Sequence, residues 1–401
     1  MNATTPSAAG LSVDGIDLVI NWGLGVDSTA YLVKMLEDPA AHGVDLARTL
    51  VMHQLTGDEW PATRAHAEKF VLPLLREHRV RLVQVARASR ALEIAVMDDS
   101  RQPERIIERG PWALWDEYEA GGTVPQQGGM RLCSLHAKGE VGDALIAREL
   151  GDRPFRQVMG FNADEALRSQ RDEAASKNPQ RQGVYPLIEW GWGREQCETY
   201  LYERFGVRWE KSYCSFCCFP VSMGAMADHL ERMRAHPEIA GRVLRLEYTS
   251  VSLNPQAKLF GRRSLLEQFD PGRATDRPVL AAFEEELTCP WALYHVRRIL
   301  PVAKVDPTRR GRPMRSVERV HVGRAAALGR RLRTVAERHG YPVEVDERYG
   351  RVRTWIRRRE AVLPTVEELM VTAPYHVRDK QVPRFEREWQ AHSSRGVGRR
   401  D

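Results

Sequence analysis

The sequence has no apolar run that approaches the roughly 18 residues needed to cross a membrane. Cysteine is scarce, since six in 401 residues are too few for the disulfide framework of a secreted domain. Residues 1–15 lack the basic and apolar segments of a secretory signal, and we expect residues 1–14 to form a flexible tail. These absences predict a cytoplasmic protein without membrane contact, in which clustered cysteines indicate metal binding or catalysis.

Several enzyme motifs are also missing. The glycine-rich segment near the N-terminus is not followed by Gly-Lys-Ser/Thr, which excludes a Walker A loop, and it lacks the G-x-G-x-x-G spacing of the dinucleotide fingerprint. The sequence has neither a G-x-S-x-G elbow nor an H-E-x-x-H helix. Function must therefore be sought outside the P-loop NTPases, the common serine hydrolases and the zincin proteases.

Charge is ordinary in amount but uneven in distribution. Hydrophobic residues make up 42% and charged residues 28%, which excludes wholesale disorder, and the length suggests two or three domains. Residues 301–401 hold 24 Lys and Arg against 13 Asp and Glu, an excess of 11 positive charges, whereas residues 1–300 carry a net charge of −5. The basic character therefore belongs to the C-terminal quarter of the chain.

Short buried runs alternate with helical patterns in the first half of the sequence. Strands are predicted at residues 16–21, 49–53, 81–85 and 155–160, and helices at 30–36, 60–77, 134–150 and 195–205. This alternation predicts an α/β fold with a doubly wound parallel sheet. We expect this domain to span residues 15–222 and residues 91–129 to form an irregular loop that covers a site.

The rest of the chain is predicted to form a helical extension (residues 223–300) and a basic C-terminal region (301–401). A helical pattern over residues 223–246 is interrupted at Pro237. Residues 309–313 are expected to form a linker or exposed loop, residues 352–356 a strand, and residues 365–370 a short helix.

The first strand is followed by the segment Gly23-Leu24-Gly25-Val26-Asp27-Ser28-Thr29. Glycine permits the positive φ angles of a tight turn and close backbone approach to a ligand, and the following helix would add its free N–H groups. The segment is therefore a candidate phosphate cradle. The alternative is a strand-to-helix turn with a good N-cap and nothing bound.

This segment resembles the PP-loop of the adenine nucleotide alpha-hydrolase superfamily, written S-G-G-x-D-S. Five further segments resemble, in order, motifs of the phosphoadenylylsulfate (PAPS) reductase-like branch. They are Thr56-Gly57-Asp58-Glu59-Trp60-Pro61-Ala62-Thr63 (D-T-G-x-E-x-P-x-T), Cys133-Ser134-Leu135-His136-Ala137-Lys138 (C-T-x-x-x-K), Gly160-Phe161-Asn162-Ala163-Asp164-Glu165-Ala166-Leu167-Arg168 (G-x-R-A-D-E-S-x-R), Tyr185-Pro186-Leu187-Ile188-Glu189-Trp190 (Y-P-L-I-x-W) and Cys214-Ser215-Phe216-Cys217 (C-x-x-C).

The resemblance implies a Rossmann-like domain that holds ATP or another adenylyl nucleotide at its strand ends. It places at the nucleotide Gly23, Gly25, Asp27, Ser28, Thr29, Thr56, Gly57, Glu59, Gly160 and Glu165. Lys138 would neutralise charge on a reacting phosphate, and Arg168 would contact phosphate or sulfate. Asp27 would help hold Mg²⁺ or cap the helix. As alternatives, Lys138 is a surface lysine, and Arg168 and Glu165 form an ordinary ion pair.

The cysteines offer a candidate metal site. Cys214 and Cys217 have chelating spacing, the resemblance brings Cys133 to the same sheet edge, and Cys289 is a possible fourth ligand. Three or four thiolates suit a [4Fe–4S] cluster, with zinc as the main alternative. Buried inert thiols and a catalytic dithiol are further readings. Cys197, in a helical stretch, is expected to be structural.

The resemblance implies ATP-dependent adenylylation of an acceptor with pyrophosphate release, leading to sulfur transfer from a sulfur-donor protein. The acceptor could be DNA or tRNA bound by the basic C-terminal region. The candidate anchors are Arg309, Arg310, Arg312, Arg357, Arg358 and Arg359, which could equally form a solvated surface. One alternative is reduction of PAPS or adenylylsulfate. The resemblance implies that this reaction needs a nucleophilic cysteine on a mobile C-terminal tail, and it is disfavoured because residues 391–401 contain no cysteine. The other is a non-catalytic subunit that binds nucleotide or nucleic acid.

Overall fold

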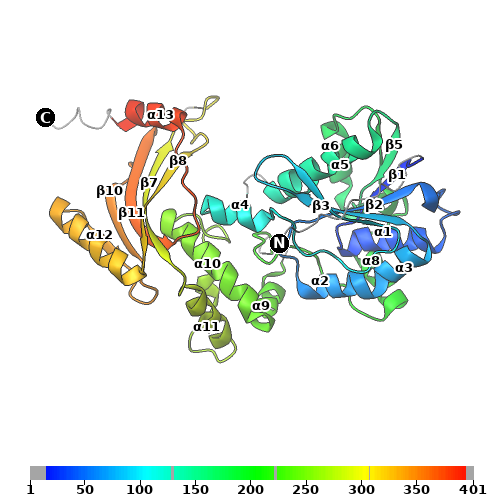
Figure 1. Cartoon of the computed structure of the whole chain (residues 1–401), viewed down its shortest axis with the longest axis horizontal. Helices are drawn as coiled ribbons and strands as arrows, with labels where there is room; N and C mark the ends of the chain where they lie inside the picture. The colour runs from blue at the N-terminus through cyan, green and yellow to red at the C-terminus, as the bar shows by residue number, and fades with distance from the viewer. Residues whose placement is uncertain (1–14, 128–130, 221–223, 307, 394–401) are drawn as a thin grey trace, which may run out of the picture. The chain divides into compact units, whose positions relative to one another are not determined.

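Two β-sheets organise the chain in the computed structural model, which describes residues 15–127, 131–220, 224–306 and 308–393. One unit contains residues 15–115 and 131–215, and the other contains residues 116–127 and 216–393 (Figure 1). The boundaries at 115 and 215 place a short internal segment with the C-terminal half of the chain, a division that the sequence did not suggest. None of the described helices is both long and apolar enough to cross a membrane.

The first unit is built on a six-stranded sheet in the order β4-β3-β2-β1-β5-β6. The strands are β1 (Leu18–Asn21), β2 (Thr49–Gln54), β3 (Arg81–Arg87), β4 (Ile94–Ser100), β5 (Phe155–Val158) and β6 (Arg181–Val184). All neighbouring strands are parallel except β4, which pairs antiparallel with β3 at one edge. The α/β prediction is confirmed at this level: the sheet is mostly parallel and compatible with a Rossmann-like fold.

Helices cover both faces of this sheet because both faces are apolar. Leu18 and Ile20 of β1 pack in one core cluster with α1 and α8, whereas Val19 packs in another with α5 (Figure 1). The helices are α1 (Val26–Glu37), α2 (Pro61–His66), α3 (Leu72–Glu77), α5 (Glu140–Leu150), α6 (Ala166–Ala175), α7 (Pro186–Glu189) and α8 (Arg194–Phe205). The 3-10 helices are η1 (Leu46–Arg48) and η4 (Ala163–Glu165), and the π-helical segments are η2 (Ala67–Val71) and η3 (Cys133–Gly139).

The loop predicted over residues 91–129 is wrong in part, because it contains strand β4 and helix α4 (Leu114–Gly121). Strand β4 opens with the short apolar run Ile94-Ala95-Val96-Met97, although it is only half-buried along its whole length. It exists because its backbone pairs with β3, for example Val85 with Val96. Residues 128–130 of the predicted loop lie outside the described residues.

The second unit contains a five-stranded antiparallel sheet in the order β8-β7-β11-β10-β9. The strands are β7 (Trp291–Leu300), β8 (Met314–Gly323), β9 (Val343–Val345), β10 (Val352–Arg357) and β11 (Thr365–Pro374). The helices are α9 (Met226–Ala235), α10 (Pro237–Leu253), α11 (Arg277–Glu286), α12 (Ala325–His339) and α13 (Pro383–Ser393), with the turn η5 (Leu266–Gln268). The predicted break at Pro237 is confirmed, and residue 223 lies outside the described residues.

The helix predicted over residues 365–370 is wrong. These residues lie in β11, which pairs with β7 from Thr365 to Pro374. Glu367, which looks solvent-facing in the sequence, is buried and paired with Arg298 of β7. Residues 308–313 are largely exposed, as predicted, and lie in the connection between β7 and β8.

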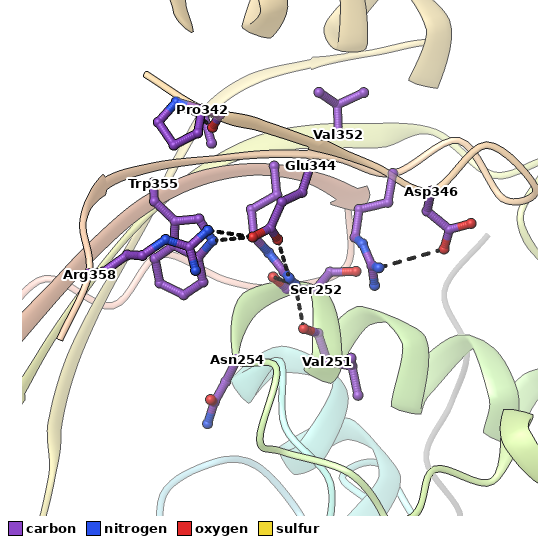
Figure 2. A network of polar contacts seen from close by, with 12 residues as sticks. Val251, Ser252, Asn254, Pro342, Glu344, Asp346, Val352, Trp355 and Arg358 are labelled. Carbon is purple, nitrogen blue, oxygen red and sulfur yellow. Dashed lines mark hydrogen bonds and ion pairs between the residues drawn. The ribbon is translucent and has the colours of Figure 1, made fainter. Parts of the chain in front are cut away.

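Arginine side chains connect elements within the second unit (Figure 2). Arg353 of β10 is buried and donates hydrogen bonds to the carbonyl oxygens of Val251 and Ser252, each at 2.7 Å, at the C-terminal end of α10. Glu344 of β9 accepts hydrogen bonds from Trp355 Nε1 at 2.9 Å and from Arg358 at 2.6 Å. These contacts satisfy terminal helix carbonyls and join β9 to β10.

Candidate functional site

The turn between β1 and α1 differs from the expectation that its glycines adopt positive φ angles. The residue in the left-handed region is Leu24, with φ of 59°. Gly25 is the N-cap of α1 and is extended, with φ of −79° and ψ of 168°. A left-handed non-glycine residue costs about 1–2 kcal/mol, and such strain concentrates at functional sites. The strained backbone therefore marks this turn as a candidate site.

The hydroxyl groups near the turn have different roles. Ser28 Oγ accepts a hydrogen bond from the Gly23 N–H at 3.2 Å and donates one to the Gly25 carbonyl at 3.2 Å. Thr29 is fully buried, and its Oγ1 accepts a hydrogen bond from Trp22 Nε1 at 3.0 Å. Ser28 thus belongs to the turn, whereas Thr29 belongs to the core and not to the phosphate-facing surface where the resemblance placed it.

Lys138 and Gly160 come from distant segments to the same turn. A Cβ atom placed on Gly23 would lie 3.7 Å from Lys138 Nζ, so the ammonium group stands directly over the turn. A Cβ atom on Gly160, just after β5, would lie 3.1 Å from Ser28 Cα and 2.9 Å from a ring carbon of Tyr31. Only glycine fits this close approach between the end of β5 and the first turn of α1.

The side chain of Asp27 is buried and does not cap helix α1. Its Oδ2 pairs with Arg194 at 2.8 Å and accepts a hydrogen bond from Asn162 Nδ2 at 3.2 Å. Burial raises the pKa of the Asp27 carboxyl despite these two partners, and burial together with Asp27 raises the pKa of the Cys197 thiol to about 12. Asp27 thus holds α1 to the β5–α6 loop and to α8.

This arrangement does not fit the magnesium role that the resemblance gave to Asp27. The oxygen that has no hydrogen-bond partner among the described residues, Oδ1, is buried, and Oδ2 is already occupied by Arg194 and Asn162. A Mg²⁺ ion prefers several accessible oxygen ligands in octahedral geometry. We therefore derive no step through magnesium.

The loop after β2 contributes the second predicted group of residues. Thr56 Oγ1 donates to Glu59 Oε1 at 3.2 Å, and Ser212 Oγ is 3.0 Å from Glu59 Oε2 and 3.4 Å from the Gly23 carbonyl. Gly57 has φ of 74°, and a Cβ atom there would meet Ala113 Cβ at 2.8 Å. The contacts of Ser212 connect this loop to the β1–α1 turn.

A depression lies beside the turn at the carboxyl ends of β1 and β2. Its lining consists of Leu24, His53, Leu55, Thr56, Gly57, Glu59, Pro61, Arg64, Ile106, Ile107 and Glu108. His53 is buried with its Nδ1 3.0 Å from the Trp22 carbonyl, and burial lowers its pKa to about 4. The ring is therefore neutral near pH 7, and Nδ1 donates its proton to that carbonyl. The lining mixes apolar side chains with the charged Glu59, Arg64 and Glu108, and the enclosed volume of about 30 Å³ holds about one water molecule.

The reversal of strand order falls between β1 and β5, whereas the depression is lined from the β2 side of β1. The chain runs from β1 to β2 on one side, and β5 lies on the other side of β1. In open α/β sheets, ligands bind beyond the carboxyl ends of the strands at such a reversal of strand order. The β1–α1 turn, Lys138 and Gly160 all meet at this point.

Arg168 forms the ordinary surface pair that was the alternative for it. Its guanidinium lies 2.5 Å from Glu165 Oε1 and stacks over the Phe161 ring at 4.5 Å from the ring centroid. Half of the Arg168 side chain is exposed. The phosphate or sulfate contact of Arg168 and the nucleotide contact of Glu165 stay predictions.

The six cysteines form no disulfide. Cys133 and Cys214 belong to the first unit, and Cys217 and Cys289 to the second. Within the ranges that the structure describes, no group of three or more His, Cys, Asp or Glu side chains is arranged to hold a metal ion. The cluster and zinc hypotheses therefore stay predictions, whereas Cys197 is buried as expected of a structural residue.

Sequence reasoning did not identify four residues at the site: His53, Asn162, Arg194 and Ser212. Asn162 lies inside the G-x-R-A-D-E-like segment, so its position carried a signal. His53 was judged ordinary because it has no metal-like spacing, and its burial becomes evident only in the folded sheet. Arg194 and Ser212 carried no sequence signal.

Comparison with known proteins gives no independent support for the family resemblance. No protein-family model matches the chain, and neither a curated protein nor a solved structure is significantly similar to it. The assignment of a family therefore rests on the six sequence segments and stays a prediction.

Proposed function

We propose that the first unit binds an adenosine polyphosphate, with the phosphates against residues 23–28 and the adenine ring on the surface beside Leu24 and Leu55. The observation that supports this most is the ammonium group of Lys138, which stands 3.7 Å from the Cβ position of Gly23. A cation held over a strained strand-to-helix turn is suited to an anion. The ring of His53 is neutral and adds no charge of its own beside Leu24 and Leu55.

The reaction that we propose is adenylylation of an acceptor. A nucleophilic oxygen of the acceptor forms a bond to the α-phosphorus of ATP, and its proton passes to water. The bond from that phosphorus to the oxygen bridging the β-phosphate breaks, and pyrophosphate leaves with the bonding electrons. Lys138 would offset negative charge that develops on the phosphates during this step.

Sulfur transfer is a further step of this proposal. A separate donor protein would supply a persulfide, whose terminal sulfur bonds to the acceptor carbon and displaces AMP. A thiol would then reduce the resulting disulfide and release the thiolated acceptor. The chain would supply activation, and the donor protein would supply the sulfur atom.

One observation favours a second candidate, a non-catalytic nucleotide-binding subunit. The Gly23 N–H and the Ser28 hydroxyl are already satisfied within the turn, at 3.2 Å each. Because these donors are already bonded within the turn, they are not free to stabilise charge on a reacting phosphate, which favours binding without catalysis. Pyrophosphate release separates the two candidates, because a protein that only binds ATP releases none.

Calorimetry with ATP on the full chain tests binding, and Lys138→Met tests the role of the ammonium group. Losing a hydrogen bond to a charged group costs about 1.5–3 kcal/mol, so we expect ATP affinity to fall by roughly 10- to 150-fold. Adenosine affinity should change little, because adenosine has no phosphate. The control is Lys69→Met, which removes an exposed lysine of the same unit.

Pyrophosphate release is then measured with ATP and either tRNA or duplex DNA as acceptor. Release that depends on the acceptor and falls in Lys138→Met supports adenylylation. Binding without release supports the non-catalytic candidate. If the folded protein gives no heat with ATP, ADP or PAPS, with magnesium present, the proposed nucleotide site is wrong.

A further inference from the structure

The arginines of the second unit divide into two groups. In the sheet, Arg297 pairs with Glu386, Arg298 with Glu367, and Arg353 with Glu344, and Arg351 just before β10 pairs with Asp346. The arginines on helix α12 and at its N-cap have no ion-pair partner among the described residues; they are Arg324, Arg330, Arg331, Arg333 and Arg338. Helix α12 with its N-cap thus concentrates five arginines without ion pairs on one element, whereas others without an ion pair in the described ranges, such as Arg262, Arg263 and Arg273, lie elsewhere in the unit.

The anchors predicted from the sequence belong largely to the compensated group. Arg309 pairs with Asp306, Arg358 with Glu344, and Arg359 with Glu367. Arg357 donates a hydrogen bond to the Ser393 carbonyl. Three of the six, Arg310, Arg312 and Arg357, lack an ion pair within the described ranges, and Arg357 is held by its hydrogen bond, so α12 replaces this set as the stronger candidate.

The apolar side of α12 is already used by the fold. Leu328, Leu332 and Ala336 are buried, and α12 contacts β10 and β11 of the sheet. A Cβ atom on Gly329 would lie 3.0 Å from Val352 Cγ2, which shows how closely the helix approaches β10. Figure 1 shows α12 along the sheet, on the side opposite α10. The other side of the helix faces solvent.

The exposed side of α12 carries a regular row of positive charge. Arg324, Arg331 and Arg338 are seven residues apart and exposed, and seven residues make almost two helical turns. The row therefore follows the helix for about 21 Å, the axial length of about six base-pair steps. The exposed side chains between them, Ala327 and Thr334, are small and leave the guanidinium groups accessible.

The chemistry of this row favours phosphodiesters over other anions. Planar guanidinium groups bind phosphate oxygens through paired N–H donors. A membrane-binding helix would need exposed apolar side chains, whereas the leucines of α12 are buried against the sheet. Glu337 is the one carboxylate in the helix. The residue types and the length of the row match a regularly spaced line of phosphodiester groups.

We propose that the exposed side of α12 is a nucleic-acid binding surface that contacts the phosphodiester backbone through Arg324, Arg330, Arg331 and Arg338. Binding is independent of base sequence, because the row offers charge and no base-reading side chains. The surface belongs to the second unit and does not depend on the proposed nucleotide site. If the proposed nucleotide site is also confirmed, the α12 surface indicates that the acceptor of the adenylylation reaction is a nucleic acid.

The test is fluorescence anisotropy of the full-length protein with a labelled 20-base-pair DNA duplex over a range of KCl concentrations. A triple variant, Arg330→Gln, Arg331→Gln and Arg338→Gln, removes three of the four charges of the proposed surface from exposed positions. We expect affinity to fall at least tenfold at low salt. The slope of log K against log salt should become shallower by about 2.7, because each phosphate contact contributes about 0.9.

A matched control removes the same charge elsewhere. Arg262→Gln, Arg263→Gln and Arg273→Gln alter three exposed arginines of the second unit outside α12, and DNA affinity should change less than twofold. Glu337→Gln removes the carboxylate of α12 and should tighten binding. Calorimetry with ATP on the triple variant should match the wild type, so a failed nucleotide site and a failed α12 surface give different results.

Three outcomes would overturn the proposal. The α12 variant could retain full DNA affinity, the control variant could lose as much affinity as the α12 variant, or the wild type could bind anionic vesicles or a poly-glutamate peptide and no nucleic acid. Single-stranded DNA and a hairpin RNA are tested in parallel, and the strongest binding among the three identifies the form of nucleic acid preferred. A circular-dichroism melt confirms that each variant is folded.

Discussion

Replacing Gly160 with alanine tests the junction on which the candidate site depends. The added methyl group would lie 2.9 Å from a ring carbon of Tyr31, 3.1 Å from Ser28 Cα and 3.2 Å from Ser28 Cβ. Unstrained carbon contacts are about 3.5–4.0 Å, so the neighbours must move by about half an ångström. Tyr31 cannot yield easily, because its ring is fully buried and its hydroxyl donates a hydrogen bond to the Asn21 carbonyl.

The expected cost follows from this geometry. Overpacking a close-packed interior costs about 1–3 kcal/mol, and the lower entropy of the unfolded alanine chain returns about 0.4–1 kcal/mol. We therefore expect the first unit to lose about 1–2 kcal/mol, a decrease of about 2–8 °C in its Tm. Because Ser28 must move, ATP affinity should also fall, by about tenfold.

The assay is a thermal melt combined with calorimetry on the same preparation. The control is Gly323→Ala in the second unit, where the nearest side-chain atoms would lie 3.8 Å from the new methyl group and no strain arises. Its Tm should stay within about 2 °C of the wild type. A Gly160→Ala protein with unchanged Tm and unchanged ATP affinity would refute the reasoning, because it would mean that the junction is loosely packed.

Two further predictions concern buried titratable groups. Burial lowers the pKa of His53 to about 4, whereas the unfolded side chain titrates near 6.5, so the unfolded state binds more protons between these values and the free energy of unfolding falls as the pH drops. This loss should reach about 3 kcal/mol at pH 4 when measured by urea unfolding, and it should be absent in His53→Gln. Identical pH profiles for the wild type and His53→Gln would contradict this prediction. Removing the partner in Arg194→Met should cost about 1–3 kcal/mol at pH 7. Burial raises the pKa of Asp27, so the folded carboxyl retains its proton to higher pH than the unfolded one, and the loss should grow as the pH rises above about 4. A double variant with Asp27→Asn should recover most of the stability, and no recovery would show that Arg194 acts through other contacts.

The four inner strands of the first sheet could be predicted because most of their residues are buried, whereas the edge strands β4 and β6 were not predicted. Residues 18–21, 49–54 and 155–158 lie where the pattern placed them. Strand β11 could not be predicted, because Glu367 is tolerated in a buried strand only through its pairing with Arg298 on a neighbouring strand. Local sequence carries no information about such a partner.

The candidate site divides in the same way. Local sequence identified the turn at residues 23–28, and the resemblance added Lys138 and Gly160. It could not show that Thr29 is directed into the core or that Asp27 is occupied by Arg194, because both outcomes depend on packing between distant segments.

The sequence by itself determined that the chain begins with an α/β unit and that its C-terminal quarter carries the excess of positive charge. Only the tertiary structure decided which arginines remain available. Carboxylates from other strands and helices pair with Arg297, Arg298 and Arg353 of the second sheet, and the apolar side of α12 packs on that sheet. The arginines of α12 remain exposed because composition fixes how much charge the chain carries, whereas folding fixes which charges meet a partner.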